Sequence, residues 1–391
     1  MDIGADKITI VGGGIGGLTA ANALAQRGAR VRLLEQAPHI TEVGAGLQIS
    51  PNGMRVLRAL GLGPIADDRG TASDGVELID GCSGRIVMRM DLRDQDYKFF
   101  HRADLIELLA NAARASHVDL KLLQQVNHIE LGDVNTVTMA QGQVITPKIL
   151  IGADGLHSKL RPEIAGARQP FFTNQVAWRC LVPLKDHVPN VARIYMGPKR
   201  HIVTYPLRGG SVLNVVAVEE RREWADEGWF HRDDPANLQA AFSMFCPDIR
   251  KLLSQVDDVY LWGLFRHDVA QVWAKGQAAL LGDAAHPTLP FMAQGAVMAM
   301  EDAWMLGHML AAANERQVSV AQALKSYETG RIDRVRRVIA AANANAGHYH
   351  IAFAPKRVLA HGALRALGKI KPDFVQKRFD WIYGYDVTQQ K

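Results

Sequence analysis

The feature that most constrains the fold is a cluster of glycines near the start of the chain. The cluster reads Gly12-Gly-Gly-Ile-Gly-Gly17 and comes directly after the apolar run Lys7-Ile-Thr-Ile-Val11. Apolar residues then recur at helical spacing from Leu18 to Arg27, and a second apolar run ends at Glu35. A strand, a tight glycine turn, a helix and a second strand form a βαβ unit, which predicts a parallel sheet covered by helices.

The spacing of these glycines, Gly12-x-Gly14-x-x-Gly17, predicts a dinucleotide site. Gly12 permits the tight turn, Gly14 lets the backbone approach a pyrophosphate, and Gly17 allows close packing of the helix. The helix N-terminus stabilises the phosphate charge. Glu35 lies eighteen positions after Gly17 and can accept hydrogen bonds from ribose hydroxyls. The motif does not distinguish FAD from a nicotinamide nucleotide, and a simple tight turn is the alternative.

Two later aspartates favour FAD. Asp154 stands in Gly152-Ala-Asp-Gly-Leu-His-Ser-Lys-Leu-Arg161 and Asp283 in Gly282-Asp-Ala-Ala-His-Pro287, each directly after an apolar strand. Doubly wound folds place ligand groups at such strand ends, where a carboxylate can hold ribityl hydroxyls. A single aspartate here is usually a helix cap, but two after a glycine motif favour a flavin. The helix expected after residues 290–296 could stabilise an anionic reduced flavin through its N-terminal amides.

The composition argues against several classes of protein. Hydrophobic residues make up 48% of the 391 residues, yet no apolar run approaches the ~18 residues of a membrane span. Three widely spaced cysteines indicate neither a disulfide framework nor a zinc site, which predicts a cytoplasmic protein without a metal. The net charge of +5 suits anionic nucleotides and carboxylates. The densest basic cluster is interpreted as a solvated helix face rather than a nucleic-acid surface; its members are Arg331, Arg334, Arg336 and Arg337.

The length predicts a large mixed domain that carries a smaller one. Residues 175–182 and 200–218 alternate like half-exposed strands, with a turn at 208–211, and predict an inserted antiparallel sheet. The pattern is helical from Gln294 to about Asn345, and residues 349–391 show no clear period. We therefore expect an FAD-binding domain, a substrate domain and a C-terminal extension; their respective residues are 1–72, 99–172 and 268–346, then 73–98 and 173–267, then 347–391.

With these motifs in this order, the chain resembles the FAD-dependent aromatic-ring hydroxylases, such as salicylate, 3-hydroxybenzoate and 6-hydroxynicotinate hydroxylases. The resemblance covers nearly the whole chain. Besides the Gly12 motif, it is carried by Gly44-Ala-Gly-Leu-Gln48, His101-Arg-Ala-Asp-Leu105, Gly152 to Arg161 and Gly282 to Asp302. It implies an α/β fold: a Rossmann-like FAD-binding domain of the glutathione-reductase type, an inserted antiparallel-sheet substrate domain and a C-terminal helical region.

The resemblance also implies the cofactors. Arg102 would contact the FAD, Asp154 would support both FAD and the nicotinamide nucleotide, and Asp283 would bind the ribityl chain. NAD(P)H would reduce the flavin, and dioxygen would form a flavin hydroperoxide whose distal oxygen attacks an electron-rich ring. The expected cofactor-binding residues are Gly12, Gly14, Ile15, Gly16, Gly17, Glu35, Gly46, Leu47, Arg102, Val126, Asp154, Asp283, Gly295, Ala296 and Val297.

Such chemistry needs a base that pushes a substrate phenol toward phenolate. Our candidates are His201 and Tyr205, in Arg200-His-Ile-Val-Thr-Tyr-Pro206. Four positions apart on a strand, both point to one face, where they could address one ring hydroxyl. Imidazole titrates near neutral pH, and family members place a histidine and a tyrosine at this spacing beside the substrate. A structural histidine with a core tyrosine is the alternative.

Three more residues are expected to contact the substrate: Gln48, Arg179 and Pro290. Arg179 can pair with a carboxylate, although a salt bridge elsewhere is the alternative. Gln48 stands where 6-hydroxynicotinate enzymes carry a histidine, and Pro290 where the 3-hydroxybenzoate branch has a glutamine. Residues 292–295 and 381–386, in contrast, resemble the hydroxynicotinate type. We expect a small hydroxylated aromatic or heteroaromatic carboxylate, with salicylate-like substrates first and the 3-hydroxybenzoate and 6-hydroxynicotinate types as alternatives.

Two other functions fit the same motifs. An FAD-dependent reductase on this fold would not consume oxygen, and a flavin-binding sensor would not be an enzyme. The expected partners are the aromatic acid, dioxygen and a second copy of the chain in a homodimer.

Overall fold

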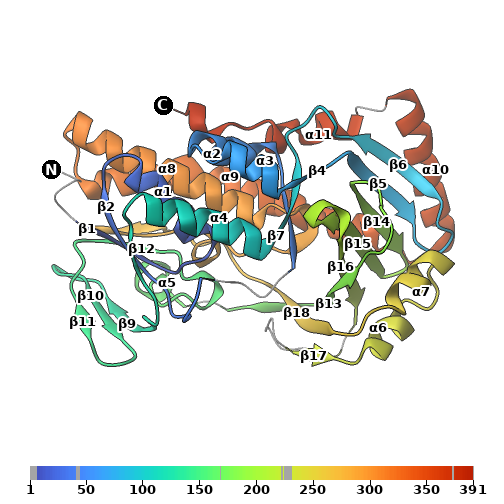
Figure 1. Ribbon diagram of the computed structural model, residues 1–391, viewed down its shortest axis with the longest axis horizontal. Coiled ribbons are helices and arrows are strands. Elements are labelled where there is room, and N and C mark those ends of the chain that lie inside the picture. Colours follow the sequence, from blue (N-terminus) through green and yellow to red (C-terminus); the bar gives the residue numbers. More distant parts are fainter. Residues whose placement is uncertain are drawn as a thin grey trace.

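The computed structural model describes residues 7–40, 45–167, 169–221, 223, 231–371 and 374–390. Figure 1 shows two halves side by side: a parallel sheet with its helices, and a larger mixed sheet. Gly44, which begins the second glycine-rich segment, lies outside the described residues.

The first half is built on a sheet of six strands in the order β19-β20-β12-β1-β2-β8. All neighbours are parallel except the edge strand β19, which pairs antiparallel with β20. The inner strands are apolar and buried because they are covered on both faces. The bounds are β1 (Lys7–Val11), β2 (Arg30–Leu34), β8 (Asp119–Lys121), β12 (Ile149–Gly152), β19 (Ala274–Lys275) and β20 (Ala278–Leu280).

Helices and a small sheet cover these strands. Helix α1 (Ile15–Ala25) packs against α4 (Arg102–Ala115) and α8 (Gly295–Arg316). A three-stranded sheet contributes its buried residues to the same core; it contains β9 (Val126–Glu130), β10 (Thr136–Met139) and β11 (Val144–Ile145). The order β1, glycine turn, α1, β2 confirms the predicted βαβ unit.

The second half is a sheet of eight strands in the order β17-β18-β13-β16-β15-β14-β5-β6. Its pairs are antiparallel except β14 with β5, which run parallel. The bounds are β5 (Gly75–Asp80), β6 (Ile86–Asp91), β13 (Phe171–Pro183), β14 (Val191–Gly197), β15 (Arg200–Leu207), β16 (Val212–Glu220), β17 (Arg232–Asp233) and β18 (Val259–Arg266). Strands β5 and β6 lie in the predicted substrate-domain segment 73–98 and join this sheet. The predicted domain boundaries stay a proposal.

A small sheet of order β3-β7-β4 and several short helices complete both halves. The N-cap of the second helix is Ser50, and Asn52 lies buried in the first turn, where its side chain donates to Glu301 of α8. The bounds are β3 (Gly46–Ile49), β4 (Thr71–Ala72), β7 (Lys98–His101), α2 (Pro51–Ala59), α3 (Gly63–Arg69), α5 (Arg161–Ala165), α6 (Pro235–Ala241) and α7 (Pro247–Leu253).

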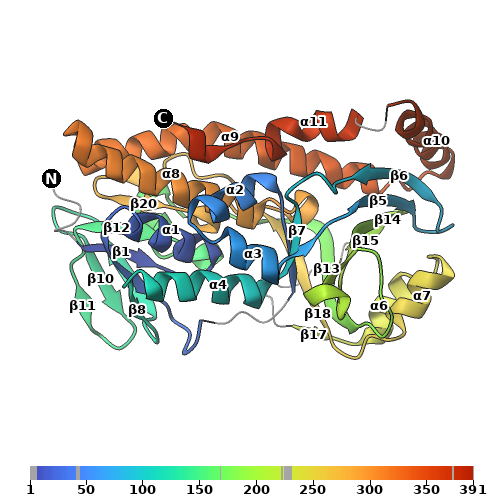
Figure 2. The same ribbon diagram turned by 45° about the horizontal axis from the view of Figure 1, so that its top comes forward.

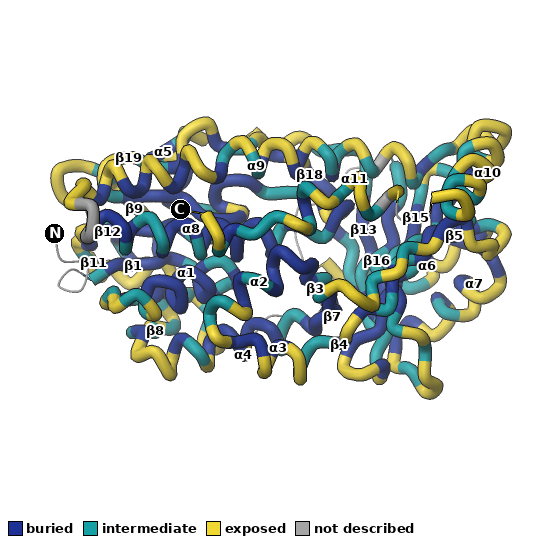
Figure 3. Tube along the Cα trace, turned by 90° about the horizontal axis from the view of Figure 1, so that it is seen from above, coloured by how far each residue is buried: buried dark blue, intermediate teal, exposed yellow. Residues whose placement is uncertain are grey.

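The C-terminal third is helical. Helix α9 (Val320–Tyr349) runs from the parallel-sheet half to the mixed sheet (Figure 2), and α10 (Ala354–Ile370) packs against β6. Residues 349–391 show no clear period in the sequence, but α10 and α11 (Phe374–Tyr383) are helices, in agreement with the C-terminal helical region that the resemblance implied. Helix α10 also carries exposed apolar residues such as Leu359, 75% exposed, so its sequence lacks the one-sided period of an amphipathic helix. Figure 3 shows the exposed outer surfaces of α9 and α10.

Among the residues placed in the structure, no helix is both long and apolar enough to cross a membrane.

Candidate active site

The glycine turn between β1 and α1 has the shape that a pyrophosphate requires. Gly12 has a positive φ of 106°, and a Cβ at Gly17 would lie 1.9 Å from the carbonyl oxygen of Gly12. A Cβ at Gly14, in contrast, would meet nothing within 4 Å. The turn is therefore closed on its inner side and open at the N-terminus of α1, where the amides of Ile15, Gly16 and Gly17 begin the helix.

Glu35 also forms hydrogen bonds to the glycine turn, which the sequence did not indicate. Its Oε2 accepts a hydrogen bond from the amide of Gly13 at 2.6 Å, and its Oε1 accepts one from the amide of Ala37 at 2.8 Å. The carboxylate therefore holds the glycine turn in place. Contact with a ribose stays a prediction.

Asp154 and Asp283 both follow strands of the parallel sheet, at its carboxyl edge. Asp154 Oδ2 accepts a hydrogen bond from the amide of Lys159 at 2.7 Å, whereas its Oδ1 is buried without a hydrogen-bond partner among the described residues. Burial raises the pKa of Asp154. Asp283 is exposed, and its charge acts on Arg102 of α4, whose pKa burial lowers. An orphaned acceptor, an open glycine turn and a guanidinium beside a carboxylate fit an FAD.

The segment before α8 is held by buried amides. Gln294, the N-cap of α8, donates from Nε2 to the hydroxyl of Ser50 at 2.9 Å and accepts from Asn52 at 3.2 Å. Ala293 adopts a left-handed conformation with φ of 53°. The amides of Gly295, Ala296 and Val297 therefore begin α8 in a fixed position, as an anion site at a helix N-terminus requires.

We expect Gly14→Ala to weaken FAD binding by roughly tenfold or more, since the methyl group occupies the space that a pyrophosphate needs. The fold should survive, because no atom lies within 4 Å of the added Cβ. Titration of apoprotein with FAD, followed by flavin fluorescence, measures the change. Gly362→Ala is the matched control, as its Cβ also meets nothing. Equal affinity in the two variants would contradict the predicted role of Gly14.

Tyr205 lies where the mixed sheet meets the small sheet. It is 4% exposed, and its ring lies 5.1 Å from that of Phe99 between centroids. A Cβ at Gly46 would come within 2.5 Å of the tyrosine ring, and the amide of Gly46 donates to Asn214 Oδ1 at 2.7 Å. Burial raises the pKa of Tyr205 despite the nearby charge of Arg179, so the phenol stays protonated at neutral pH. Among the predicted cofactor residues, Gly46 therefore borders the predicted base, and Leu47 follows it on β3.

His201 lies on the same face of β15 but has other neighbours. Its ring is 5.2 Å from that of Tyr349 and 5.9 Å from that of Phe291, between centroids. Its Nδ1 is 2.6 Å from Nε2 of His350. Burial, and then the charge of His350, hold the pKa of His201 well below its usual value. Residues 201 and 205 are about 13 Å apart along the strand. That both side chains address one hydroxyl group of the substrate stays a prediction.

Arg179 on β13 reaches the same region. Its guanidinium lies over the ring of Trp262, 4.8 Å from the centroid. Burial lowers the pKa of Arg179 to about 10, with a further contribution from the charge of Arg102 and an opposing one from Tyr205. At neutral pH it remains a cation between the predicted FAD residues and the predicted base. A low-dielectric setting strengthens its attraction for a carboxylate.

Among the remaining predicted residues, Gln48 is within the site and Pro290 is exposed. Gln48 Oε1 accepts a hydrogen bond from the hydroxyl of Tyr97 at 2.9 Å. The ring of Tyr97 lies 6.4 Å from that of Tyr383, between centroids. Val126 lies buried at the start of β9. Sequence reasoning did not assign Tyr97, Tyr349, His350 or Tyr383 to the site. Tyr97 lies in the loop between β6 and β7, Tyr349 and His350 lie at the end of α9, and Tyr383 ends α11, and none of them belongs to a cofactor motif.

A buried cluster of charged side chains connects α8 to α9. Arg331 donates from Nη2 to Glu301 and from Nε to Asp302, both at 2.7 Å, and all three side chains are fully buried. Arg334 and Asn52 donate to Glu301, and His286 lies 2.5 Å from Asp302. The interpretation of Arg331 and Arg334 as a solvated helix face was therefore wrong, because α9 is covered by α8 on this side.

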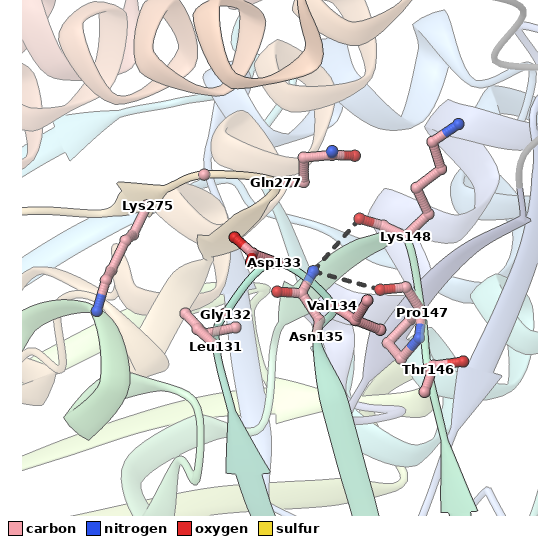
Figure 4. A pocket seen from close by; sticks show the side chains of 11 residues that line it. Leu131, Gly132, Asp133, Val134, Asn135, Thr146, Pro147, Lys148, Lys275 and Gln277 are labelled. Carbon is pink, nitrogen blue, oxygen red and sulfur yellow. Dashed lines mark hydrogen bonds between the residues drawn. The ribbon is translucent and has the colours of Figure 1, made fainter.

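A pocket of about 420 Å³ lies away from these residues, between segments 131–135, 146–148 and 275–277 (Figure 4). Its lining includes Lys148 and Gln277, which precede β12 and β20, and Asn135, which donates to the carbonyl oxygen of Lys148 at 3.3 Å. It therefore lies at the amino edge of the parallel sheet, opposite Asp154 and Asp283. No group of three or more metal-binding side chains occurs in the part of the chain that the structure describes.

The parallel sheet, the open glycine turn and the paired strand-end aspartates define an FAD-binding α/β protein that also contains a cluster of buried aromatic side chains. Comparison with known proteins agrees: residues 6–342 match the family of the FAD binding domain. The chain belongs to this family, and within it to the FAD-dependent monooxygenases that hydroxylate aromatic rings with NAD(P)H as reductant.

Individual relatives cover almost the whole chain. A 3-hydroxybenzoate 6-hydroxylase of Polaromonas naphthalenivorans is 33% identical over 97% of this chain and 96% of its own. A 6-hydroxynicotinate 3-monooxygenase of Bordetella bronchiseptica is 33% identical over 86% and 90%. Klebsiella pneumoniae HpxO, solved with FAD and uric acid, is 27% identical with a TM-score of 0.81, covering 93% of this chain and 94% of its own. These comparisons confirm the predicted fold class, enzyme class and cofactor.

Proposed function

We propose that this enzyme hydroxylates a small phenolic aromatic or heteroaromatic carboxylate. The observation that carries the proposal is the half-buried cation Arg179 near Tyr205, because it offers a carboxylate a partner among aromatic side chains. Sequence signals favoured salicylate first. Relatives named for 3-hydroxybenzoate and 6-hydroxynicotinate, each at 33% identity, support a preference for those acids in this proposal.

The residues of this chain would act on the substrate in distinct ways. Arg179 would bind the carboxylate, His201 would accept the proton of the ring hydroxyl, and Tyr205, which stays protonated, would donate a hydrogen bond to the same ring. Phe291 and Tyr349, beside His201, would exclude water. FAD, when bound, supplies electrons from NAD(P)H to dioxygen so that one oxygen atom is transferred to the ring. The predicted FAD residues would hold it beside Tyr205.

We expect the purified protein to be yellow and its NAD(P)H oxidation to accelerate with the right acid. Screening 3-hydroxybenzoate, 6-hydroxynicotinate and salicylate with an oxygen electrode and product analysis tests this. A phenolic product formed with oxygen consumption supports the proposal. Substrate reduction without oxygen consumption would indicate the reductase, and a bound flavin that neither nicotinamide nucleotide reduces would indicate the sensor.

We further propose a cytoplasmic homodimer. All three cysteines are free thiols, as a reducing compartment maintains them. Helix α10 presents Val358, Leu359 and Ile370 to the outside, each at least 70% exposed, which a second copy could cover. Sedimentation analysis of the FAD-loaded protein measures the assembly state.

A further inference from the structure

The predicted base is connected to the surface by a chain of hydrogen bonds. His201 Nδ1 lies 2.6 Å from His350 Nε2, and His350 Nδ1 lies 2.8 Å from Glu220 Oε1. The side chains of His201 and His350 are buried, whereas that of Glu220 is 37% exposed. The three residues come from β15, the end of α9 and the end of β16, so only the folded chain brings them together.

The carboxylate determines the tautomer of each imidazole. An ionised Glu220 only accepts hydrogen bonds, so His350 must carry its proton on Nδ1 and accept at Nε2. His201 must then donate from Nδ1, which leaves its Nε2 as the accepting nitrogen. The base is thereby held in the form that can take a proton from a substrate hydroxyl.

Both imidazoles are also neutral at pH 7, as this arrangement requires. Burial and the charge of Arg200 lower the pKa of His350, and the ion pair with Glu220 only partly opposes them. Another titratable group beside His201 is the phenol of Tyr349, whose pKa burial raises to about 12. Glu220 is the carboxylate that completes the chain at its solvent end.

We propose that Glu220 and His350 form a proton relay that carries the substrate's hydroxyl proton from His201 to solvent. The substrate O–H bond breaks as an N–H bond forms at His201 Nε2. The Nδ1 proton of His201 passes to His350 Nε2, the Nδ1 proton of His350 passes to Glu220, and the protonated carboxyl releases it to water. The substrate becomes a phenolate and one proton appears in solution. The reverse sequence restores the tautomers when the product phenolate is reprotonated. This inference rests on the proposed function.

A backbone hydrogen bond also holds His350 close to His201. The amide of Lys199, between β14 and β15, donates to the carbonyl oxygen of His350 at 3.3 Å. The C-terminal end of α9 is therefore attached to the sheet at the place where His350 contacts His201. Among the described residues, hydrogen bonds connect Glu220 and His350 to the site through His201, so they would act through that residue.

Proton release on ligand binding tests the relay without turnover. FAD-loaded protein is mixed in a stopped-flow instrument with 3-hydroxybenzoate, 6-hydroxynicotinate or salicylate in weak buffer with a pH indicator. We expect wild-type protein to release about one proton per bound acid, and Glu220→Gln and His350→Gln to release it roughly tenfold or more slowly. Added imidazole should restore part of the rate in His350→Ala. The pH profile of release should change in the same variants, while flavin fluorescence shows FAD still bound.

His361→Gln is the matched control, since His361 is a buried histidine bonded to a carboxylate, Asp80, at 2.9 Å, far along the chain from His201. Wild-type release rates and pH profiles in Glu220→Gln and His350→Gln would overturn the relay and leave the proposed function standing. Equal slowing in His361→Gln would also overturn it. Wild-type protein that releases no proton with any of the three acids would overturn both.

Discussion

Arg331→Met is expected to lower the free energy of unfolding by about 3–5 kcal/mol, because it leaves Glu301 and Asp302 as buried charges with incomplete partners. Burial alone would raise the pKa of both carboxyls, yet neighbouring side chains hold both pKa values below their usual range: first Arg331 for Glu301, and His286 with Arg331 for Asp302. Denaturant unfolding of the FAD-loaded protein at neutral pH measures the loss.

Arg336→Met is the matched control on the same helix. Arg336 is 41% exposed, and among the described residues it donates to Gln271 and lies 3.9 Å from Asp333, so its replacement should change stability by about 0.5 kcal/mol or less. If Arg331→Met cost no more than this control, the buried cluster would not stabilise α8 and α9.

Replacing the predicted base should raise the activation free energy of hydroxylation by an amount comparable to the loss of stability in Arg331→Met. We expect His201→Ala to lower the rate of hydroxylation by roughly 10²-fold or more, since a positioned base contributes at least that much. Tyr205→Phe, which removes only a hydroxyl, should lower it as well. The measurement is product formation with the acid that the substrate screen identifies, together with flavin fluorescence to show that FAD remains bound.

The two variants separate two interpretations. Loss of hydroxylation with FAD retained and NAD(P)H oxidation still stimulated indicates that the residues act on the substrate ring. Unchanged product formation in both would exclude them as catalytic residues and favour the alternative of a structural histidine and a core tyrosine.

The predicted cofactor site depended on local patterns. Gly12, Gly14 and Gly17 define a turn whose geometry involves a few neighbouring residues, and Asp154 and Asp283 each end an apolar strand. A parallel sheet places all its strand ends at one edge, so separate local signals predicted a common site. The helical C-terminal region was implied by the family resemblance and not by a local period, because α10 exposes apolar residues such as Leu359.

The sequence by itself determined the βαβ unit, the FAD-binding motifs and the strand that carries His201 and Tyr205, because backbone conformation there follows from adjacent residues. Only the tertiary structure decided that Arg331 is buried and that His350, 149 positions after His201, completes its hydrogen bonds. These features depend on side chains from distant segments. The packing of α9 against α8 and against the mixed sheet, rather than any local pattern, sets their environment.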